Sequence, residues 1–191
     1  MQTSNATDTL VLDLSASVEG GALHVRYALI NRAGRAIVAF DGATGTGGGP
    51  FPDLTGQCYV SFADGAVRVQ RIRPSPHPSI DTTRIFMPAV SQIAPQETRR
   101  VQFRLPLPVK ERSEYTPDYP GATYEQQLVN RLELRIGYFF KTGETVLKPL
   151  GTPGVFQAVK GASLSQTFQV AQICPATIDV LVRTDAEFLR M

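Results

Sequence analysis

The feature of this sequence that most constrains its fold is a succession of short apolar–polar alternations separated by glycine, proline and aspartate turns. A period of two places one face of a strand in a core and the other in solvent, and it does not fit a helix. About ten such runs occur, without a sustained amphipathic helix, at residues 9–18, 23–29, 36–40, 58–62, 66–72, 100–107, 132–140, 155–159, 165–173 and 177–183. The pattern predicts an all-β antiparallel β-sandwich of about ten strands, with a barrel as the alternative.

Three connections predict hairpins. Gly20-Gly21 joins the first two runs, and Asp64-Gly65 joins the runs at 58–62 and 66–72. Glycine accepts positive φ without strain, so both dipeptides favour tight two-residue turns. The stretch 23–40, LHVRYALINRAGRAIVAF, also reads as a hairpin, with its two apolar strands pairing across a short polar turn.

Residues 123–131 fit two structures. Thr123 followed by Gln126 has capping-box spacing, and Tyr124, Leu128 and Leu132 lie at helical intervals. The continuation, residues 132–140, alternates as a strand. We therefore expect at most one helical turn before a long strand.

Length and composition indicate one soluble globular domain. The chain has 191 residues, of which 42% are hydrophobic and 19% charged, so global disorder is not expected. The expected boundaries are a polar tail at 1–8, a sandwich domain at 9–183 and a second tail at 184–191. No apolar run reaches the roughly 20 residues that cross a bilayer, so membrane insertion is not expected. The N-terminus lacks the features of a signal peptide. The expected location is cytoplasmic, or exported if a signal has been removed ahead of Met1.

The charge balance gives no indication of a nucleic-acid partner. The formal net charge is only +2, and the arginines cluster near two strands, as Arg68, Arg71 and Arg73 and as Arg99, Arg100 and Arg104. Without interleaved exposed aromatic residues, we interpret these arginines as solvated sheet faces and edge protection.

The two cysteines, Cys58 and Cys174, both interrupt apolar strand patterns. Free cysteine behaves as a small hydrophobe, so we predict two buried free thiols, with a disulfide between them as the alternative. Neither cysteine has a second metal ligand nearby, so no zinc site is expected.

No motif assigns catalytic residues, a metal or a cofactor. The glycine-rich loop from Gly42 to Gln57 lacks the lysine and the following helix of phosphate-binding loops. His24 and His77 are the only histidines, and no nucleophile signature accompanies them. Nothing in the sequence excludes an enzyme, and nothing argues for one.

Two stretches carry a resemblance to a family. Residues 23–40, with an alternating strand that ends in asparagine before a short turn, and IAPQETRRVQFRLPLP (93–108) resemble the corresponding parts of bacterial immunoglobulin-like β-sandwich modules. The resemblance covers about a third of the chain and implies a fold class. It departs from antibody-type domains, because tryptophan is absent and the cysteines are too far apart.

The segment VKERSEYTPDYPGATYEQQ (109–127) is the candidate binding region. It gathers Tyr115, Asp118, Tyr119 and Tyr124 beside two prolines, and tyrosines on stiff loops are typical of recognition surfaces. The alternative is that these rings cover the sandwich end. We therefore predict a non-catalytic binding or structural module that contacts a protein partner or copies of itself, with carbohydrate as a further partner class. The alternative is a small hydrolase or lyase, or a carbohydrate-binding accessory unit.

Overall fold

The computed structural model describes residues 9–42, 58–73, 89–112, 121–151, 153–160, 166–175 and 177–184. The glycine-rich loop, most of the proline-rich segment around His77 and most of both predicted tails lie outside the described residues. Within them the chain is all-β, with several sheets and no helix, and the arrangement is consistent with the predicted β-sandwich.

Sheet A contains three antiparallel strands in the order β1-β2-β7. They are β1 (Leu10–Glu19), β2 (Ala22–Asn31) and β7 (Thr98–Pro106). The predicted Gly20-Gly21 turn joins β1 to β2, with Glu19 paired to Ala22, and both glycines have positive φ (56° and 73°). This is the geometry that lets a two-residue loop follow the right-handed twist of two strands.

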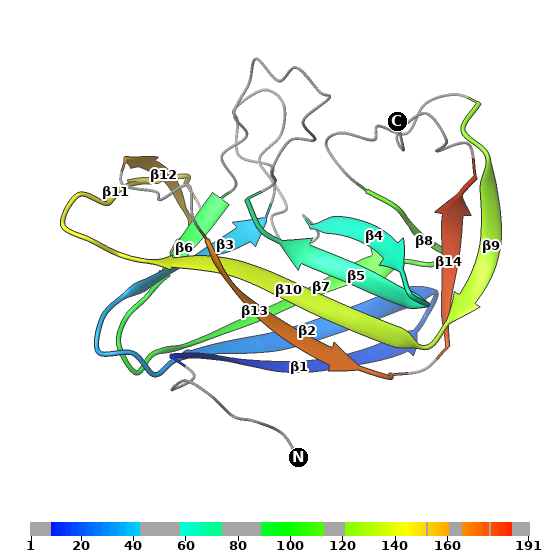
Figure 1. Cartoon of the computed structure of the whole chain (residues 1–191), viewed down its shortest axis with the longest axis horizontal. Coiled ribbons are helices and arrows are strands. Elements are labelled where there is room, and N and C mark those ends of the chain that lie inside the picture. The colour runs from blue at the N-terminus through cyan, green and yellow to red at the C-terminus, as the bar shows by residue number, and fades with distance from the viewer. Residues whose placement is uncertain are drawn as a thin grey trace.

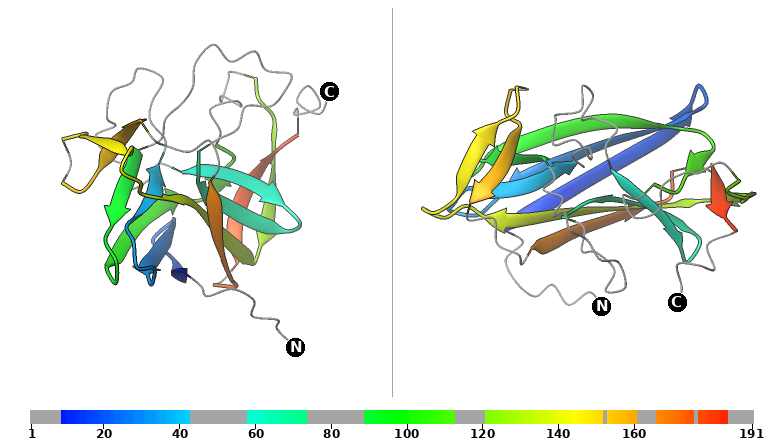
Figure 2. Two further views of the ribbon diagram at one scale, coloured as in Figure 1. Left: turned by 60° about the vertical axis from the view of Figure 1, so that its left-hand side comes forward. Right: turned by 90° about the horizontal axis from the view of Figure 1, so that it is seen from above.

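Sheet B is the largest sheet and lies over sheet A (Figure 2). Its strands are β3 (Ile37–Gly42), β4 (Tyr59–Ala63), β5 (Ala66–Arg71), β6 (Ala89–Ile93), β10 (Arg131–Phe140), β11 (Val146–Pro149), β12 (Phe156–Lys160) and β13 (Thr167–Ile173). Their order is β11-β12-β6-β3-β10-β5-β4, and β13 pairs with the other edge of β10. The predicted Asp64-Gly65 hairpin is confirmed, because β4 and β5 pair around it in the expected register.

Sheet C covers one end of the sandwich, opposite the β11–β12 hairpin (Figure 1). It contains β8 (Val109–Lys110), β14 (Ile178–Arg183) and β9 (Tyr124–Val129), with β14 in the middle. The helical turn considered for residues 123–131 is therefore wrong. All six residues of β9 pair with β14, and this ladder outweighs the local helical preference.

Fourteen strands lie within the described residues, against about ten expected. The four that the sequence did not indicate are β6, β8, β9 and β11. Three of them are short or largely exposed, and β6 is buried on both faces, so none shows a clear alternation.

The predicted hairpin at residues 23–40 is wrong. β2 pairs with β1 and β7 in sheet A, whereas β3 pairs with β6 and β10 in sheet B, so the connection crosses from one layer to the other. The alternation of each strand is as expected, but alternation defines the faces of a strand and not which strand lies along each edge. The turn at residues 94–97, which joins β6 to β7, is a second crossing beside the first.

Asn31 joins these two crossings. Its main-chain N–H donates to Glu97 O and its carbonyl accepts from Gln96 N. Its fully buried side chain donates to the carbonyls of Arg35, Ile93 and Ala94, each at 3.0 Å, and accepts from Ala33 N at 2.9 Å. One asparagine thereby satisfies polar groups of both crossings where they enter the core.

The main core lies between the sheets. Sheet A contributes Leu23, Val25, Tyr27, Leu29, Phe103 and Leu105, and the facing strands contribute Ile37, Val67, Val69, Leu132, Leu134 and Ile136. A second, smaller cluster lies on the other face of sheet B, where Val38, Phe40, Val90, Phe139 and Ala158 pack together. Because the first four residues of β3 are buried on both faces, they form a continuous apolar run.

Candidate ligand-binding surface

The outer face of sheet A carries a group of polar side chains. The register places Arg104 opposite His24, Gln102 opposite Arg26, and Arg100 opposite Ala28. On the other side of β2, β1 adds Ser17, Ser15 and Asp13 in the same rows. The apolar residues that alternate with them point into the core, so the sandwich itself holds these side chains outward.

Two adjoining hollows lie along this face. One has a volume of about 450 Å³ and reaches from Asp13 and Ser15 to Arg100. The other has a volume of about 830 Å³ and extends past His24 and Arg104 to Pro106. Both are lined by Arg26 and Gln102, so they form one surface, which we call the arginine groove.

The groove has an excess of positive charge, because three arginines and one carboxylate, that of Asp13, line it. Arg26, Arg100 and Arg104 are exposed, and none forms an ion pair or a side-chain hydrogen bond with any described residue. Arg26 is a diagonal neighbour of both other arginines, and diagonal neighbours in antiparallel sheets lie roughly 7–8 Å apart. Like charges at this spacing repel one another, and an anion placed between them would remove the repulsion.

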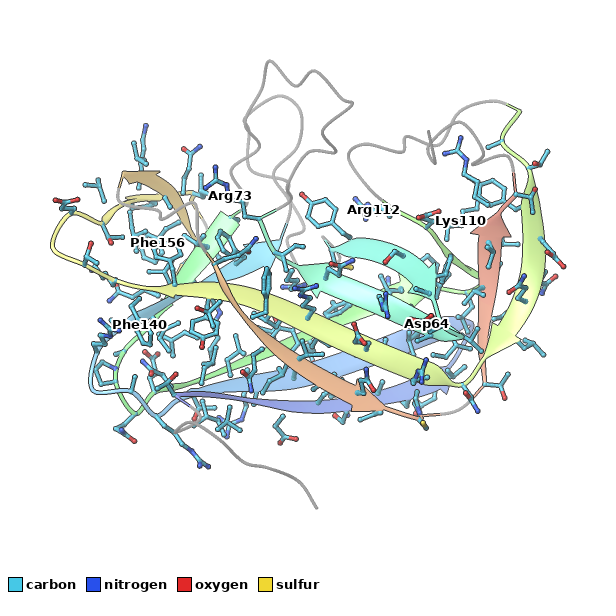
Figure 3. All side chains as sticks on the ribbon, viewed as in Figure 1. Asp64, Arg73, Lys110, Arg112, Phe140 and Phe156 are labelled. Atoms are coloured by element: carbon cyan, nitrogen blue, oxygen red, sulfur yellow. The ribbon has the colours of Figure 1, made fainter. Side chains whose placement is uncertain are left out.

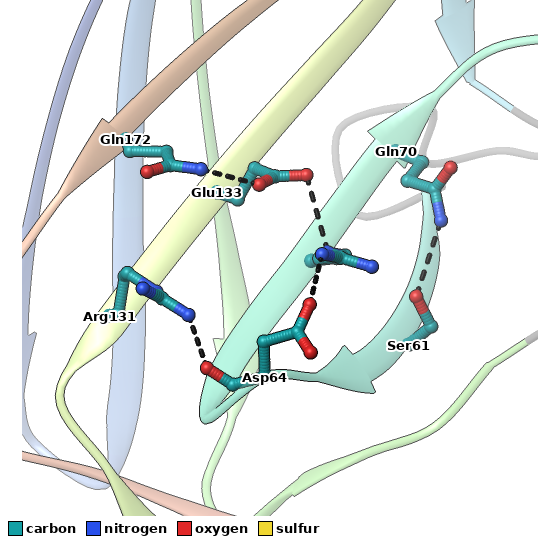
Figure 4. Close-up of polar contacts among 7 residues, drawn as sticks. Ser61, Asp64, Gln70, Arg131, Glu133 and Gln172 are labelled. Atoms are coloured by element: carbon teal, nitrogen blue, oxygen red, sulfur yellow. Dashed lines mark hydrogen bonds and ion pairs between the residues drawn. The ribbon is translucent and has the colours of Figure 1, made fainter.

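The outer face of sheet B shows the opposite arrangement (Figure 4). The guanidinium of Arg68 lies 2.8 Å from the carboxylate of Asp64 and 3.4 Å from that of Glu133. Gln172 donates to Glu133 at 2.6 Å, and Arg131 donates to the main-chain carbonyl of Asp64. Here the charges stabilise one another across β5, β10 and β13, as expected of a face with a structural role.

Of the four predicted binding residues, only Tyr124 lies among the described residues. Tyr115, Asp118 and Tyr119 lie outside them, so a shared site with Tyr124 stays a prediction. Tyr124 begins β9 and is half-buried, with the Nζ atom of Lys110 4.9 Å from its ring centroid. In Figure 3 Lys110 lies beside β14, at the end of the molecule that sheet C covers.

The expectation of solvated arginines is wrong for Arg71, which is 2% exposed and lies in the core. Its Nη1 donates to the hydroxyl of Tyr27 at 3.2 Å, and its guanidinium carbon lies 4.7 Å from the ring centroid of Phe103. Arg68 and Arg71 do point to opposite faces of β5, as the alternation indicates. The face of Arg71 meets sheet A instead of solvent, and sequence could not show this.

The cysteine prediction is half right. Cys58 and Cys174 are both free thiols, but only Cys58 is buried. Burial raises the pKa of the Cys58 thiol, and the nearby charges of Arg71 and Arg112 oppose this increase. Cys174 is exposed because it follows the last residue of β13, where the apolar pattern of that strand ends.

The described residues show no further chemical centre. No three His, Cys, Asp or Glu side chains among them form a metal-binding group. Ser17 lies opposite His24 in the register, but within the described ranges no hydrogen bond joins their side chains. No helix in the described part of the chain could span a membrane. What this geometry offers is a polar sheet face on which arginine side chains outnumber carboxylates.

Sequence reasoning identified some members of the groove without bringing them together. It noted Arg100 and Arg104 near one strand and His24 as one of the two histidines, and it did not connect them with each other or with Arg26. The sequence did not show that β2 and β7 are neighbours, because paired residues of these two strands are some 75 positions apart in the chain. Comparison of the chain with protein-family models, with curated proteins and with solved structures finds no match.

Proposed function

We propose that this protein is a non-catalytic binding module that holds an anionic ligand in the arginine groove. The observation that carries the proposal is the contrast between the two outer faces. Sheet B pairs Arg68 with two carboxylates, whereas on sheet A the three groove arginines form no ion pair with any described residue. Asp13 is the one carboxylate that lines the groove, so the arginines outnumber the acids there by three to one. Since the whole chain has a net charge of only +2, this is a local concentration and not a consequence of overall charge.

The groove also suits binding better than catalysis. Two neighbouring strands fix the backbone positions from which its side chains project into open solvent, so the spacing of the charges is set before a ligand binds, and binding has to order only the exposed side chains. Guanidinium groups bind carboxylates, sulfates and phosphates through paired hydrogen bonds, which favours an oxyanion as the ligand.

We also propose that the sandwich is immunoglobulin-like in a broad sense. The support is the pair of crossings, β2 to β3 and β6 to β7, which join the two layers side by side. The tyrosine segment remains a predicted second contact for a protein partner or another copy of the chain.

Two unrelated polyanions, dextran sulfate and polyphosphate, test the binding proposal. Affinity is measured at several salt concentrations for the natural chain and for a variant with Arg26→Gln, Arg100→Gln and Arg104→Gln. We expect at least one polyanion to bind and the triple variant to bind at least tenfold more weakly, with a shallower dependence on salt, because fewer counterions are released.

The control is a second triple variant, Arg32→Gln, Arg35→Gln and Arg112→Gln, which removes the same charge from exposed positions outside the groove. It is expected to retain most of the affinity. Equal weakening by both variants, or no binding of either polyanion, would contradict the proposal.

A further inference from the structure

The three arginines of the groove are spaced along a line. Arg100 and Arg104 lie four residues apart on one face of β7, which corresponds to about 13 Å at the usual strand rise. Arg26 on β2 lies opposite Gln102, halfway between them. A small anion cannot reach both ends of such a row, whereas an extended chain with repeated negative charges can.

The groove also contains neutral groups that both donate and accept hydrogen bonds. Gln102 lies between Arg100 and Arg104 on β7, and Ser15 contributes a hydroxyl from β1, on the other side of Arg26. Amides and hydroxyls suit a ligand whose uncharged parts also donate and accept, as sugar hydroxyls do. Polyphosphate has only acceptor oxygens to offer at these positions.

The side chains that point outward in these rows include no phenylalanine, tyrosine or tryptophan, and their single aromatic ring is the imidazole of His24. The larger rings of Tyr27 and Phe103 point inward and are 4% and 6% exposed. Single-stranded nucleic acids need aromatic platforms on which their bases stack, and peptides are usually anchored by apolar pockets. Both partner classes fit this surface less well than a hydroxyl-rich polyanion.

We infer that the ligand of the arginine groove is a linear acidic polysaccharide, carboxylated or sulfated, that lies along β2 and β7. The inference rests on the proposed function and names its ligand class. Acid groups of the polysaccharide contact Arg100, Arg26 and Arg104 in turn, while Gln102 hydrogen-bonds to hydroxyls between them.

The test measures affinity for oligogalacturonates of increasing length by isothermal titration calorimetry. Affinity is expected to rise with length and to level off once the oligomer spans the distance from Arg100 to Arg104. The methyl-esterified oligomer, which keeps the hydroxyls but lacks the charges, is expected to bind at least tenfold more weakly. Dextran sulfate, measured in parallel, distinguishes a preference for sulfates from a preference for carboxylates.

Polyphosphate, polyglutamate and single-stranded DNA of matched charge form the comparison set. Gln102→Ala is expected to weaken binding of the preferred acidic polysaccharide severalfold and to weaken binding of polyphosphate less, because phosphate oxygens can only accept from the amide whereas sugar hydroxyls can also donate to it. If a comparison polyanion binds more tightly than both acidic polysaccharides, and the arginine variants abolish that binding, the inference is overturned while the binding proposal stands. If no polyanion responds to the arginine variants, both fail.

Discussion

The side-chain amide of Asn31 donates a hydrogen bond to the carbonyl oxygen of Ile93 at 3.0 Å, although 62 residues of sequence separate them. Asn31 is the last residue of β2, after which the chain crosses from sheet A to sheet B. Ile93 is the last residue of β6, after which the chain crosses back to sheet A. The contact therefore lies where the two layers are tied together. It predicts that stability depends strongly on this one amide.

Asn31→Ala is expected to lower the free energy of unfolding by about 3 kcal/mol, because buried carbonyls lose their donor. Asn31→Asp is expected to be worse at neutral pH, since a carboxylate would face three carbonyl oxygens and cannot donate. Its deficit should shrink as pH falls and the acid becomes protonated. Chemical denaturation at several pH values measures both variants, and a loss below about 1 kcal/mol for alanine would contradict the structural role of Asn31.

Gly137 leaves room for the side chain of Gln166. The Gln166 amide pairs with the main chain of Arg73, accepting from its N–H at 3.0 Å and donating to its carbonyl at 2.7 Å. A Cβ at position 137 would collide with Oε1 of Gln166. Gly137→Ala is therefore expected to destabilise the protein by about 2 kcal/mol or more, because both hydrogen bonds are lost.

A double-mutant cycle separates this cause from a general intolerance of glycine replacement. In a Gln166→Ala background, Gly137→Ala should cost clearly less, although contact with Phe40 at 3.0 Å leaves a residual effect. If the stability losses of Gly137→Ala and Gln166→Ala simply add in the double variant, as measured by thermal or chemical denaturation, a clash with Gln166 is not the cause of the Gly137→Ala loss.

The two thiols are expected to react at very different rates in the folded protein. Cys174 is exposed, whereas Cys58 is buried and burial raises the pKa of its thiol, which keeps it protonated. Titration with a thiol reagent should give one fast group in native protein and two after denaturation. Cys174→Ser should remove the fast group. Persistence of a fast reaction in that variant would contradict the burial of Cys58.

Glu111, which follows β8, predicts a pH dependence of stability. Burial raises the pKa of its carboxyl above the ordinary value of 4.5, and the charge of Arg183 opposes the increase. The folded state thus favours the protonated form, so the contribution of this group is fully present below pH 4.5 and is lost as pH rises through the raised pKa.

Glu111→Gln should therefore gain stability relative to the natural chain as pH rises from about 4 to 7, with little difference at the acid end. Thermal unfolding across this pH range measures the gain. Glu144→Gln, at an exposed glutamate, controls for the loss of one negative charge. If Glu111→Gln instead gains most stability over the natural chain at acid pH, the raised pKa of Glu111 is contradicted.

The sequence by itself determined the strands with clear alternation and the two tight hairpin turns. These are local properties: Leu23, Val25 and Leu29 share a face because the chain is pleated, and Gly20-Gly21 and Asp64-Gly65 adopt positive φ without help from distant residues. For these features the information lies within a few residues of the chain.

Only the tertiary structure decided which edges meet and which faces are covered. It placed β2 and β3 in different sheets, buried Arg71 against Tyr27, and brought Arg26 between Arg100 and Arg104. An alternating strand carries the same pattern whichever neighbour it pairs with, because ladder hydrogen bonds join main-chain groups common to all residues. The choice of neighbours depends on the packing of the whole core, and the arginine groove follows from that choice.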